Sequence, residues 1–262
     1  MRYGVIADVH ANLHALDASL AFLATRHVDV HLCAGDLVGY GPLPNESVRR
    51  VLGLDGVCVA GNHDLIALGR LSDERCIPLA QASLRWTARV LAGDVRTALA
   101  ALPATAGIDD VVLCHGWLDD PQRYVVGEQE AIERLRGIDG ATLVITGHTH
   151  RPTAVGGRAG SLLRGQDGTV RLPPDEPVLL NPGAVGQSRS ADPSARVMVL
   201  DTAARTAAFH AVPYDVEACR GALRERGLPP GACHLPPSRW RDAASAVRRR
   251  VGRLRVVAGD RG

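Results

Sequence analysis

The segment 3–13, YGVIADVHANL, places an apolar run directly before two polar side chains of types that bind metal ions. Residues 3–7 have the length and composition of a buried strand, and Asp8 and His10 follow at its end. From residue 12 to residue 25, leucines recur at the spacing of one helical face. A buried strand that leads through a polar turn into a helix is typical of α/β folds.

The same order of strand, polar turn and helix recurs as far as about Ile145. Proline opens the helices that we predict at 44–52 and 78–91, and a third helix is predicted at 128–136. Short apolar runs predict further buried strands at 28–34, 57–60, 111–114 and 141–146.

After Arg151 the pattern changes to short apolar segments separated by glycine and proline, which indicates hairpins and a meander. We predict strands at 153–155, 161–163, 169–172, 178–180, 196–200 and 206–212. A helix at 216–226, a loop at 228–237 and a basic segment at 238–257 with helical potential follow.

Together these patterns predict an α/β (α+β) fold, a four-layer αββα sandwich in which two mixed β-sheets are flanked by helices. We predict one domain at 1–214, which includes a small hairpin insertion at about 153–178. A basic, helical C-terminal extension is predicted at 215–262.

Each of the five strands in the first half ends in polar side chains that can bind a metal ion. Ligand sites of α/β sheets lie outside the carboxyl ends of the strands, so we expect these side chains to converge. Asp8 and His10 project to the same side of an extended chain, and His148 and His150 repeat this spacing. The candidate metal ligands are Asp8, His10, Asp36, Asn62, His115, His148 and His150.

This set combines imidazole, carboxylate and amide groups without a thiolate, which suits Mn, Fe, Zn, Co or Ni better than Mg or Ca. Seven ligands exceed the needs of one tetrahedral ion. With one bridging carboxylate they can serve two ions, an arrangement that suits phosphoryl transfer. We therefore predict a dinuclear site of divalent or trivalent transition-metal ions at the strand C-terminal ends.

Five ordered motifs carry a family resemblance: D-x-H at 8–10, G-D at 35–36, G-N-H-D at 61–64, H-G at 115–116 and G-H-T-H at 147–150. In this order they resemble the calcineurin-like metallophosphoesterase superfamily. The segments GDLVGYGP at 35–42 and NPGAVGQ at 181–187 resemble more closely its compact bacterial phosphoesterase and phosphodiesterase branch. The resemblance covers the chain from Arg2 to about Tyr214.

The resemblance implies a role for each motif residue. Seven residues would hold the metal ions: Asp8, His10 and His150 the first, Asn62, His115 and His148 the second, and the bridging Asp36 both. His63 would face the phosphate and the leaving oxygen, and Asp64 would orient its ring. A hydroxide between the ions would attack phosphorus in line.

All 30 basic residues are arginine. The absence of lysine excludes a Walker phosphate loop, a protein-kinase ATP site, a pyridoxal Schiff base and a lysine aldolase. Any cationic contact with phosphate must then come from arginine. Arg123 and Arg151 are the candidates, and Tyr40, in the turn after Asp36, is a candidate neighbour of the substrate.

The composition limits the partners and the cellular location that we expect for this protein. Aromatic residues make up only 3% of the chain, which disfavours nucleic-acid binding, and a small phosphorylated substrate is expected. The six cysteines form no C-x-x-C pair, which favours a reducing compartment. Asp8 interrupts the first apolar run too early for a signal peptide or a membrane span, so we expect a cytoplasmic protein without a membrane segment. The sequence does not indicate the oligomeric state.

The predicted function is a dinuclear metal-dependent phosphoesterase acting on a phosphodiester or a nucleotide-type ester. Two alternatives stay open. A phosphomonoesterase of the Ser/Thr protein phosphatase type is disfavoured because the segment 37–41, LVGYG, stands where that group carries Asp-Arg-Gly. A non-catalytic scaffold is disfavoured because His63 and all seven ligand positions are present.

Overall fold

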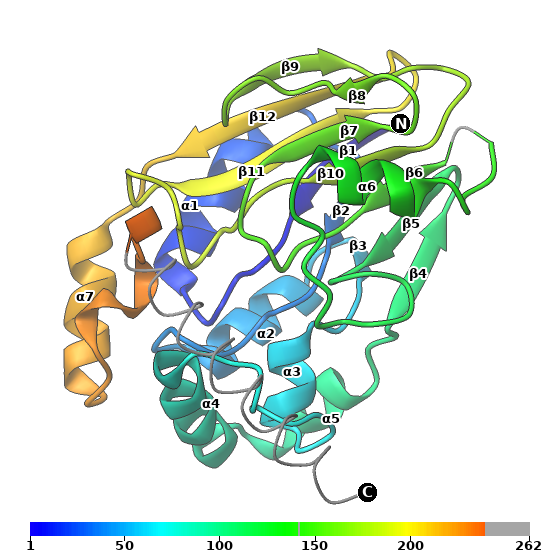
Figure 1. Ribbon diagram of the computed structural model, residues 1–262. Helices are drawn as coiled ribbons and strands as arrows, with labels where there is room; N and C mark the ends of the chain where they lie inside the picture. Colours follow the sequence, from blue (N-terminus) through cyan, green and yellow to red (C-terminus); the bar gives the residue numbers. More distant parts are fainter. Residues whose placement is uncertain (141, 239–262) are drawn as a thin grey trace, which may run out of the picture.

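Two six-stranded β-sheets lie at the centre of the computed structural model, which describes residues 1–140 and 142–238 (Figure 1). The first sheet has the order β3 (Gly56–Cys58), β2 (Val30–Cys33), β1 (Arg2–Ile6), β11 (Ala195–Asp201), β12 (Thr206–Val212) and β9 (Gly168–Arg171). The second has the order β4 (Thr105–Ile108), β5 (Val111–Cys114), β6 (Leu143–Ile145), β10 (Val178–Asn181), β7 (Thr153–Gly156) and β8 (Gly160–Ser161).

Helices cover the outer faces of both sheets. The first sheet packs against a helical layer that comprises α1 (Leu13–Ala24), α2 (Pro44–Leu52), α3 (Asn62–Ala67), α4 (Pro78–Val90), α5 (Gly93–Ala100) and α7 (Val216–Glu225). A short 3₁₀ helix, η1 (Pro230–Cys233), follows α7. The second sheet packs against α6 (Glu128–Leu135). The predicted four-layer αββα sandwich with two mixed sheets is therefore confirmed.

The alternation of side chains along β1 shows how the layers are joined. Tyr3 and Val5 point into the core between the two sheets, where they meet residues such as Leu113 of the second sheet. Ile6 points the other way, into the core beneath α1. A strand that is buried on both faces needs a continuous apolar run, and this is the pattern that residues 3–7 show.

Parallel pairing sets the position of the polar turns. Strands β1, β2 and β3 are parallel neighbours in the first sheet, and β5 and β6 are parallel neighbours in the second. The carboxyl ends of parallel strands meet at one edge of a sheet. The turns that follow these five strands therefore lie near one another.

The elements differ from the sequence prediction in several places. Helices α3 and α5 and strand β4 are not predicted by the apolar pattern, because α3 has only six residues and the other two carry few large apolar residues. The segment 153–178, predicted as one hairpin insertion, is divided between the sheets, since β7 pairs with β10 whereas β9 pairs with β12. The meander expected after residue 151 is wrong for the same reason.

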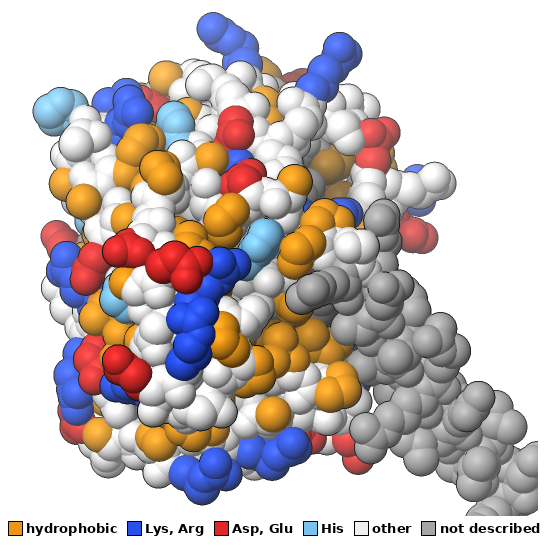
Figure 2. All heavy atoms as spheres, turned by 90° about the vertical axis from the view of Figure 1, so that its left-hand side faces the viewer, with side chains coloured by type: hydrophobic (Ala, Val, Ile, Leu, Met, Phe, Trp, Pro, Cys, Tyr) orange, Lys and Arg blue, Asp and Glu red, His pale blue; other side chains and the backbone are white. Residues whose placement is uncertain are grey.

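The C-terminal part of the prediction is described only as far as residue 238. Helix α7 buries Cys219 and Leu223 in the core that it shares with α1, and most of the predicted basic helix at 238–257 lies outside the described residues. The division into a domain and an extension stays a prediction. On the face that carries α7, acidic and basic side chains are interspersed (Figure 2). Among the described residues, no helix is long and apolar enough to cross a membrane.

Candidate metal centre

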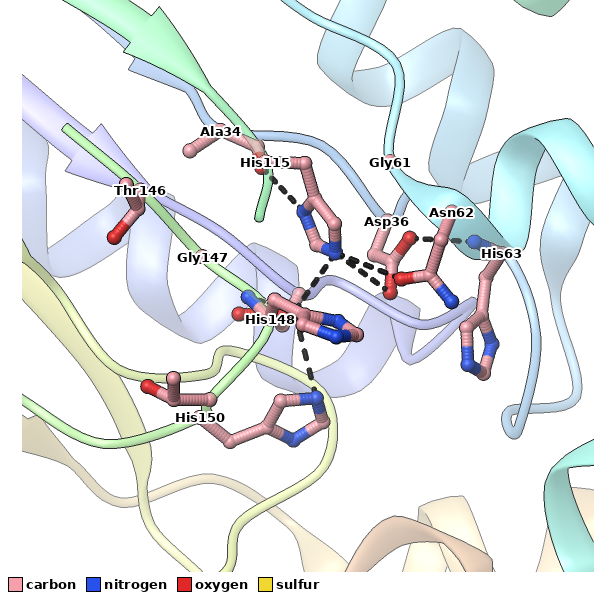
Figure 3. Close-up of polar contacts among 12 residues, drawn as sticks. Ala34, Asp36, Gly61, Asn62, His63, His115, Thr146, Gly147, His148 and His150 are labelled. Carbon is pink, nitrogen blue, oxygen red and sulfur yellow. Dashed lines mark hydrogen bonds and ion pairs between the residues drawn. The ribbon is translucent and has the colours of Figure 1, made fainter. Parts of the chain in front are cut away.

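The polar turns after β1, β2, β3, β5 and β6 bring all seven predicted ligands together. Figure 3 labels Asp36, Asn62, His115, His148 and His150 among them. The side chains are almost fully buried, with exposures of 5% or less. They form two groups, Asp8 with His10 and His150, and Asp36 with His115 and His148. A third group, His10 with Asp36 and His63, links them. Asn62 joins the second group, because its Oδ1 lies 3.0 Å from Nε2 of His115.

The first group is built around two imidazoles that face each other. Nε2 of His10 lies 3.1 Å from Nε2 of His150, and the latter lies 3.4 Å from Oδ1 of Asp8. The other ring nitrogen of His10 is 3.0 Å from the Val38 carbonyl, and that of His150 is 2.7 Å from the Gln187 carbonyl. A carbonyl can only accept, so Nδ1 carries the hydrogen in each ring and both Nε2 atoms present lone pairs.

The second group repeats this arrangement. Nδ1 of His115 lies 2.7 Å from the Ala34 carbonyl, and Nε2 lies 3.2 Å from Oδ2 of Asp36. Nε2 therefore faces two oxygen acceptors, from Asp36 and from Asn62. Nε2 of His148 is buried and has no hydrogen-bond partner among the described residues.

Lone pairs that face one another in a buried site repel unless a cation lies between them. Both groups contain buried lone pairs that face one another. Oδ2 of Asp8 is also buried and has no hydrogen-bond donor among the described residues. Carbonyl oxygens that hold the outer ring nitrogens are also the usual supports of metal-binding histidines. The residues present therefore fit metal ions of the transition series.

Backbone conformation explains how the turns deliver these side chains. Asp8, His10, Asp36, His148 and His150 have φ values of 53°, 48°, 55°, 65° and 59°, in the left-handed region that non-glycine residues rarely adopt. Such conformations persist where the surrounding structure holds them, often at functional sites. The sequence-based expectation of an extended chain at residues 8–10 and 148–150 is wrong, because Asp8, His10, His148 and His150 all have positive φ.

Glycine is required where two of the turns touch. A Cβ atom on Gly61 would collide with the backbone of Asp36, and one on Gly186 would collide with the Val9 carbonyl. These close approaches pack the turn after β3 against the turn after β2, and the segment 181–187 against the turn after β1.

Burial and mutual charge perturb the titration of the whole group. Burial opposes the charged form of His115, but the Asp36 carboxylate outweighs it and raises the pKa of the ring to about 9. Burial likewise opposes ionisation of Asp36, yet the neighbouring His115 holds its pKa well below the usual range. Burial raises the pKa of Asp8 to about 7 and lowers the pKa of His148. Shifts of this size are typical of functional sites.

His63 and Asp64 lie beside the metal ligands, at the start of α3. The His63 ring stacks on Tyr40 with a centroid distance of 5.0 Å, and its Nδ1 has no hydrogen-bond partner among the described residues. Among the described residues no hydrogen bond joins Asp64 to this ring, so its orienting role stays a prediction. The Asp64 carboxylate instead accepts backbone N–H groups of Leu37, Val38 and Gly61, at 2.9, 3.1 and 2.9 Å, and so ties the turn after β2 to α3.

The three predicted substrate-binding residues have different surroundings. Tyr40 is buried and lies edge-on to His10 at a centroid distance of 4.8 Å, so it borders the metal ligands. Arg151 is exposed and lines a cavity of about 310 Å³ together with Thr149, Val126 and Glu128. Arg123 is partly buried in the segment before α6.

Sequence reasoning missed three residues of the site: Tyr124, Gln187 and Arg189. The centroid of the Tyr124 ring lies 3.8 Å from that of the His148 ring. The Gln187 carbonyl accepts a hydrogen bond from Nδ1 of His150. Arg189 is only 5% exposed and its Nη2 lies 3.2 Å from Nε2 of His150. The motif at 181–187, which ends two residues before Arg189, is the sequence feature that pointed toward this loop.

The fold and the converging donors define a metal-binding αββα protein. Comparisons with known proteins show the family to which it belongs. The family model of the calcineurin-like phosphoesterase superfamily domain matches residues 1–205. An uncharacterised protein of Methanocaldococcus jannaschii is 29% identical over 229 residues, which cover 86% of this chain and 93% of that protein.

Two solved structures are similar over nearly the whole chain. A metallophosphoesterase from Sphaerobacter thermophilus shares 32% sequence identity at a TM-score of 0.78, covering 93% of this chain and 100% of that one. A hypothetical protein from Pyrococcus horikoshii OT3 shares 16% identity at a TM-score of 0.72, covering 88% and 96% of the two chains, which is a likeness of fold. This chain belongs to the calcineurin-like phosphoesterase superfamily, a metal-dependent family, as the sequence motifs predict.

Proposed function

We propose that this protein is a dinuclear metal-dependent phosphoesterase that hydrolyses a phosphodiester or a nucleotide-type phosphate ester. The position of Asp36 is the observation that carries the proposal. Its Oδ2 lies 3.7 Å from Nε2 of His10 and 3.2 Å from Nε2 of His115, between the two groups of donors. A carboxylate oxygen shared by two sets of ligands is what a bridging residue of a two-metal site requires.

In this proposal Asp8, His10 and His150 hold one ion, Asn62, His115 and His148 hold the other, and Asp36 contacts both. A pair of transition-metal ions in this place supplies the positive charge that acidifies water and stabilises the attacked phosphate. The second oxygen of Asp36 accepts the backbone N–H of His63 at 2.8 Å. The carboxylate is thereby held with Oδ2 toward the donors.

His63 is proposed to act on the leaving oxygen. Burial, with smaller effects of the neighbouring charges, lowers the pKa of this ring to about 4, so the imidazole is neutral at pH 7 in the absence of substrate. A negatively charged phosphate ester beside the ring would raise that pKa and favour its protonation. Protonation of His63 is therefore coupled to the arrival of the substrate, and the proton can pass to the departing oxygen.

The substrate is proposed to be small, and the cavity beside Arg151 is the place for the ester group that extends away from the phosphate. Its volume of about 310 Å³ lies at the lower end of the range for small-molecule sites. We also propose a cytoplasmic location, which is supported by the fact that all six cysteines are free thiols.

The test is a substrate panel on protein of measured metal content. It includes bis(p-nitrophenyl) phosphate, p-nitrophenyl phosphate, cyclic nucleotides, dinucleoside polyphosphates and phosphopeptides, each with and without Mn²⁺. We expect hydrolysis of diesters or nucleotides that depends on added metal and is lost in Asp36→Asn. The matched control is Asp94→Asn, which removes an exposed carboxylate that pairs with Arg49. Full activity of chelated Asp36→Asn protein would disprove the proposal.

A further inference from the structure

Arg189 is a buried cation at the edge of the metal centre. It lies in the segment between β10 and β11, outside the metal-ligand set and the predicted catalytic pair. Its side chain is 5% exposed, whereas Arg151 is exposed. A guanidinium stays charged in any protein environment and is costly to bury, so its position calls for a partner of opposite charge or a set of acceptors.

Backbone and side-chain acceptors hold this arginine in place. Nη1 lies 3.4 Å from the carbonyls of His148 and Thr149, and Nε donates to Oε1 of Gln187 at 3.2 Å. Tyr124, whose ring packs on His148, has its hydroxyl 3.5 Å from Nη1. These contacts tie the guanidinium to the same loop that carries two of the proposed metal ligands.

The remaining terminal nitrogen points at the metal centre. Nη2 lies 3.2 Å from Nε2 of His150, the atom that faces Oδ1 of Asp8 at 3.4 Å. The guanidinium therefore contacts a proposed metal ligand directly, at the edge of the metal centre. An anion that touches both a metal ion and a guanidinium satisfies the two positive groups at once.

We propose that Arg189 binds a phosphate oxygen of the substrate, the role that the sequence assigns to Arg123 or Arg151. This inference rests on the proposed function to the extent that the ligand is a phosphate ester. The arginine supplies a directed N–H donor and a fixed charge to the oxygen that lies nearest His150. It thereby fixes the orientation of the phosphate toward the proposed line of attack.

A purely structural role is the competing account, since Nη1 also supports the loop of His148 and His150. The two roles differ in what the loss of the guanidinium changes. A structural arginine would affect metal binding and stability, whereas a phosphate-binding arginine affects the affinity for phosphate at unchanged metal content.

The experiment measures binding of inorganic phosphate to metal-loaded protein by isothermal titration calorimetry. Metal content is measured by mass spectrometry, on wild type, Arg189→Gln and Arg189→Lys. We expect Arg189→Gln to weaken phosphate binding by about 10- to 100-fold with the metal content unchanged. Arg189→Lys keeps the charge but loses the planar guanidinium, so its affinity for phosphate should lie between those of wild type and Arg189→Gln. Arg49→Gln, a change at an exposed surface ion pair, is the matched control.

Phosphate binding by Arg189→Gln that equals wild type would overturn the proposal, as would a loss of metal that parallels the loss of phosphate. If Arg189→Gln does not fold, the test rests on Arg189→Lys. An affinity for phosphate in Arg189→Lys that equals the wild-type affinity would overturn the proposal, because the planar guanidinium would then not be needed. The measurement needs no turnover. Wild-type protein that binds phosphate but hydrolyses no ester would contradict the proposed function. The phosphate titrations would still test the role of Arg189, because they do not depend on hydrolysis.

Discussion

Oδ2 of Asp36 lies 3.2 Å from Nε2 of His115, and both side chains are buried. The hydrogen on Nδ1 of His115 is committed to the Ala34 carbonyl at 2.7 Å. Nε2 can therefore face the carboxylate favourably only with a second proton or with a metal ion. A proton and a metal ion compete for this atom, which couples the stability of the protein to pH and to metal together.

The first prediction concerns metal-free protein. The pKa of His115 rises from its ordinary value of 6.5 to about 9 in the folded state, so the stabilisation is complete below pH 6.5 and is lost as the pH rises through 9. The loss amounts to about 3 kcal/mol, because one pKa unit corresponds to about 1.4 kcal/mol. Thermal unfolding of chelated protein should therefore occur at lower temperature at pH 9 than at pH 6.5.

His115→Asn is the comparison for this prediction, since the amide cannot take up the proton. Its unfolding temperature should depend less on pH over the same interval. Metal-loaded wild type should show no such decline, because bound metal takes the place of the proton. Equal pH dependence in chelated wild type and in His115→Asn would contradict the assignment.

His63→Ala tests the role of the ring beside the ligands. The backbone N–H that holds Asp36 is retained in this variant, so the metal content should stay at the wild-type level. Turnover of an active substrate should fall by about 10² to 10⁴ fold if the ring donates a proton to the leaving oxygen. The measurement pairs steady-state kinetics with metal analysis, and a loss of metal would instead assign the ring to the ligands.

Asp64→Asn tests the structural role that the hydrogen bonds give to this carboxylate. Both oxygens accept backbone N–H groups, and in the variant the amide NH₂ would face one of those donors. We expect a loss of stability of about 1 to 3 kcal/mol in urea unfolding, the cost of a buried donor without an acceptor. Unchanged stability combined with lost activity would support the orienting role that the sequence suggests.

Gly186→Ala tests the contact between the segment 181–187 and the turn after β1. The new Cβ would collide with the Val9 carbonyl, so this turn must move, and Asp8 with it. We expect weaker metal binding and a destabilisation of about 1 to 3 kcal/mol. Gly221→Ala in α7 is the control, because no atom lies within 4 Å of its added Cβ and alanine favours the helix. Equal metal affinity in the two variants would show that the contact does not position Asp8.

Much of the fold follows from local pattern. The apolar run at 3–7 predicts β1, and proline at position 44 marks the start of α2, because burial on both faces and helix initiation both depend on neighbouring residues. The division of the segment 153–178 between two sheets was not predictable, since the pairing of β9 with β12 depends on residues far along the chain. Helix α3 also escaped prediction, because six residues are too few to show an apolar period.

The sequence by itself determined the family and the seven donor residues, because ordered motifs at strand ends are a local property of the chain. Only the tertiary structure brought these donors into contact. His10 and His150 are 140 residues apart, yet their Nε2 atoms lie 3.1 Å from each other. His148 and His150 are two residues apart, both in the left-handed conformation, and belong to different groups. The structure also placed Arg189 at the edge of the metal centre and showed that the Asp64 carboxylate accepts hydrogen bonds from backbone N–H groups. Contacts of such long range depend on the packing of the two sheets, which local sequence does not specify.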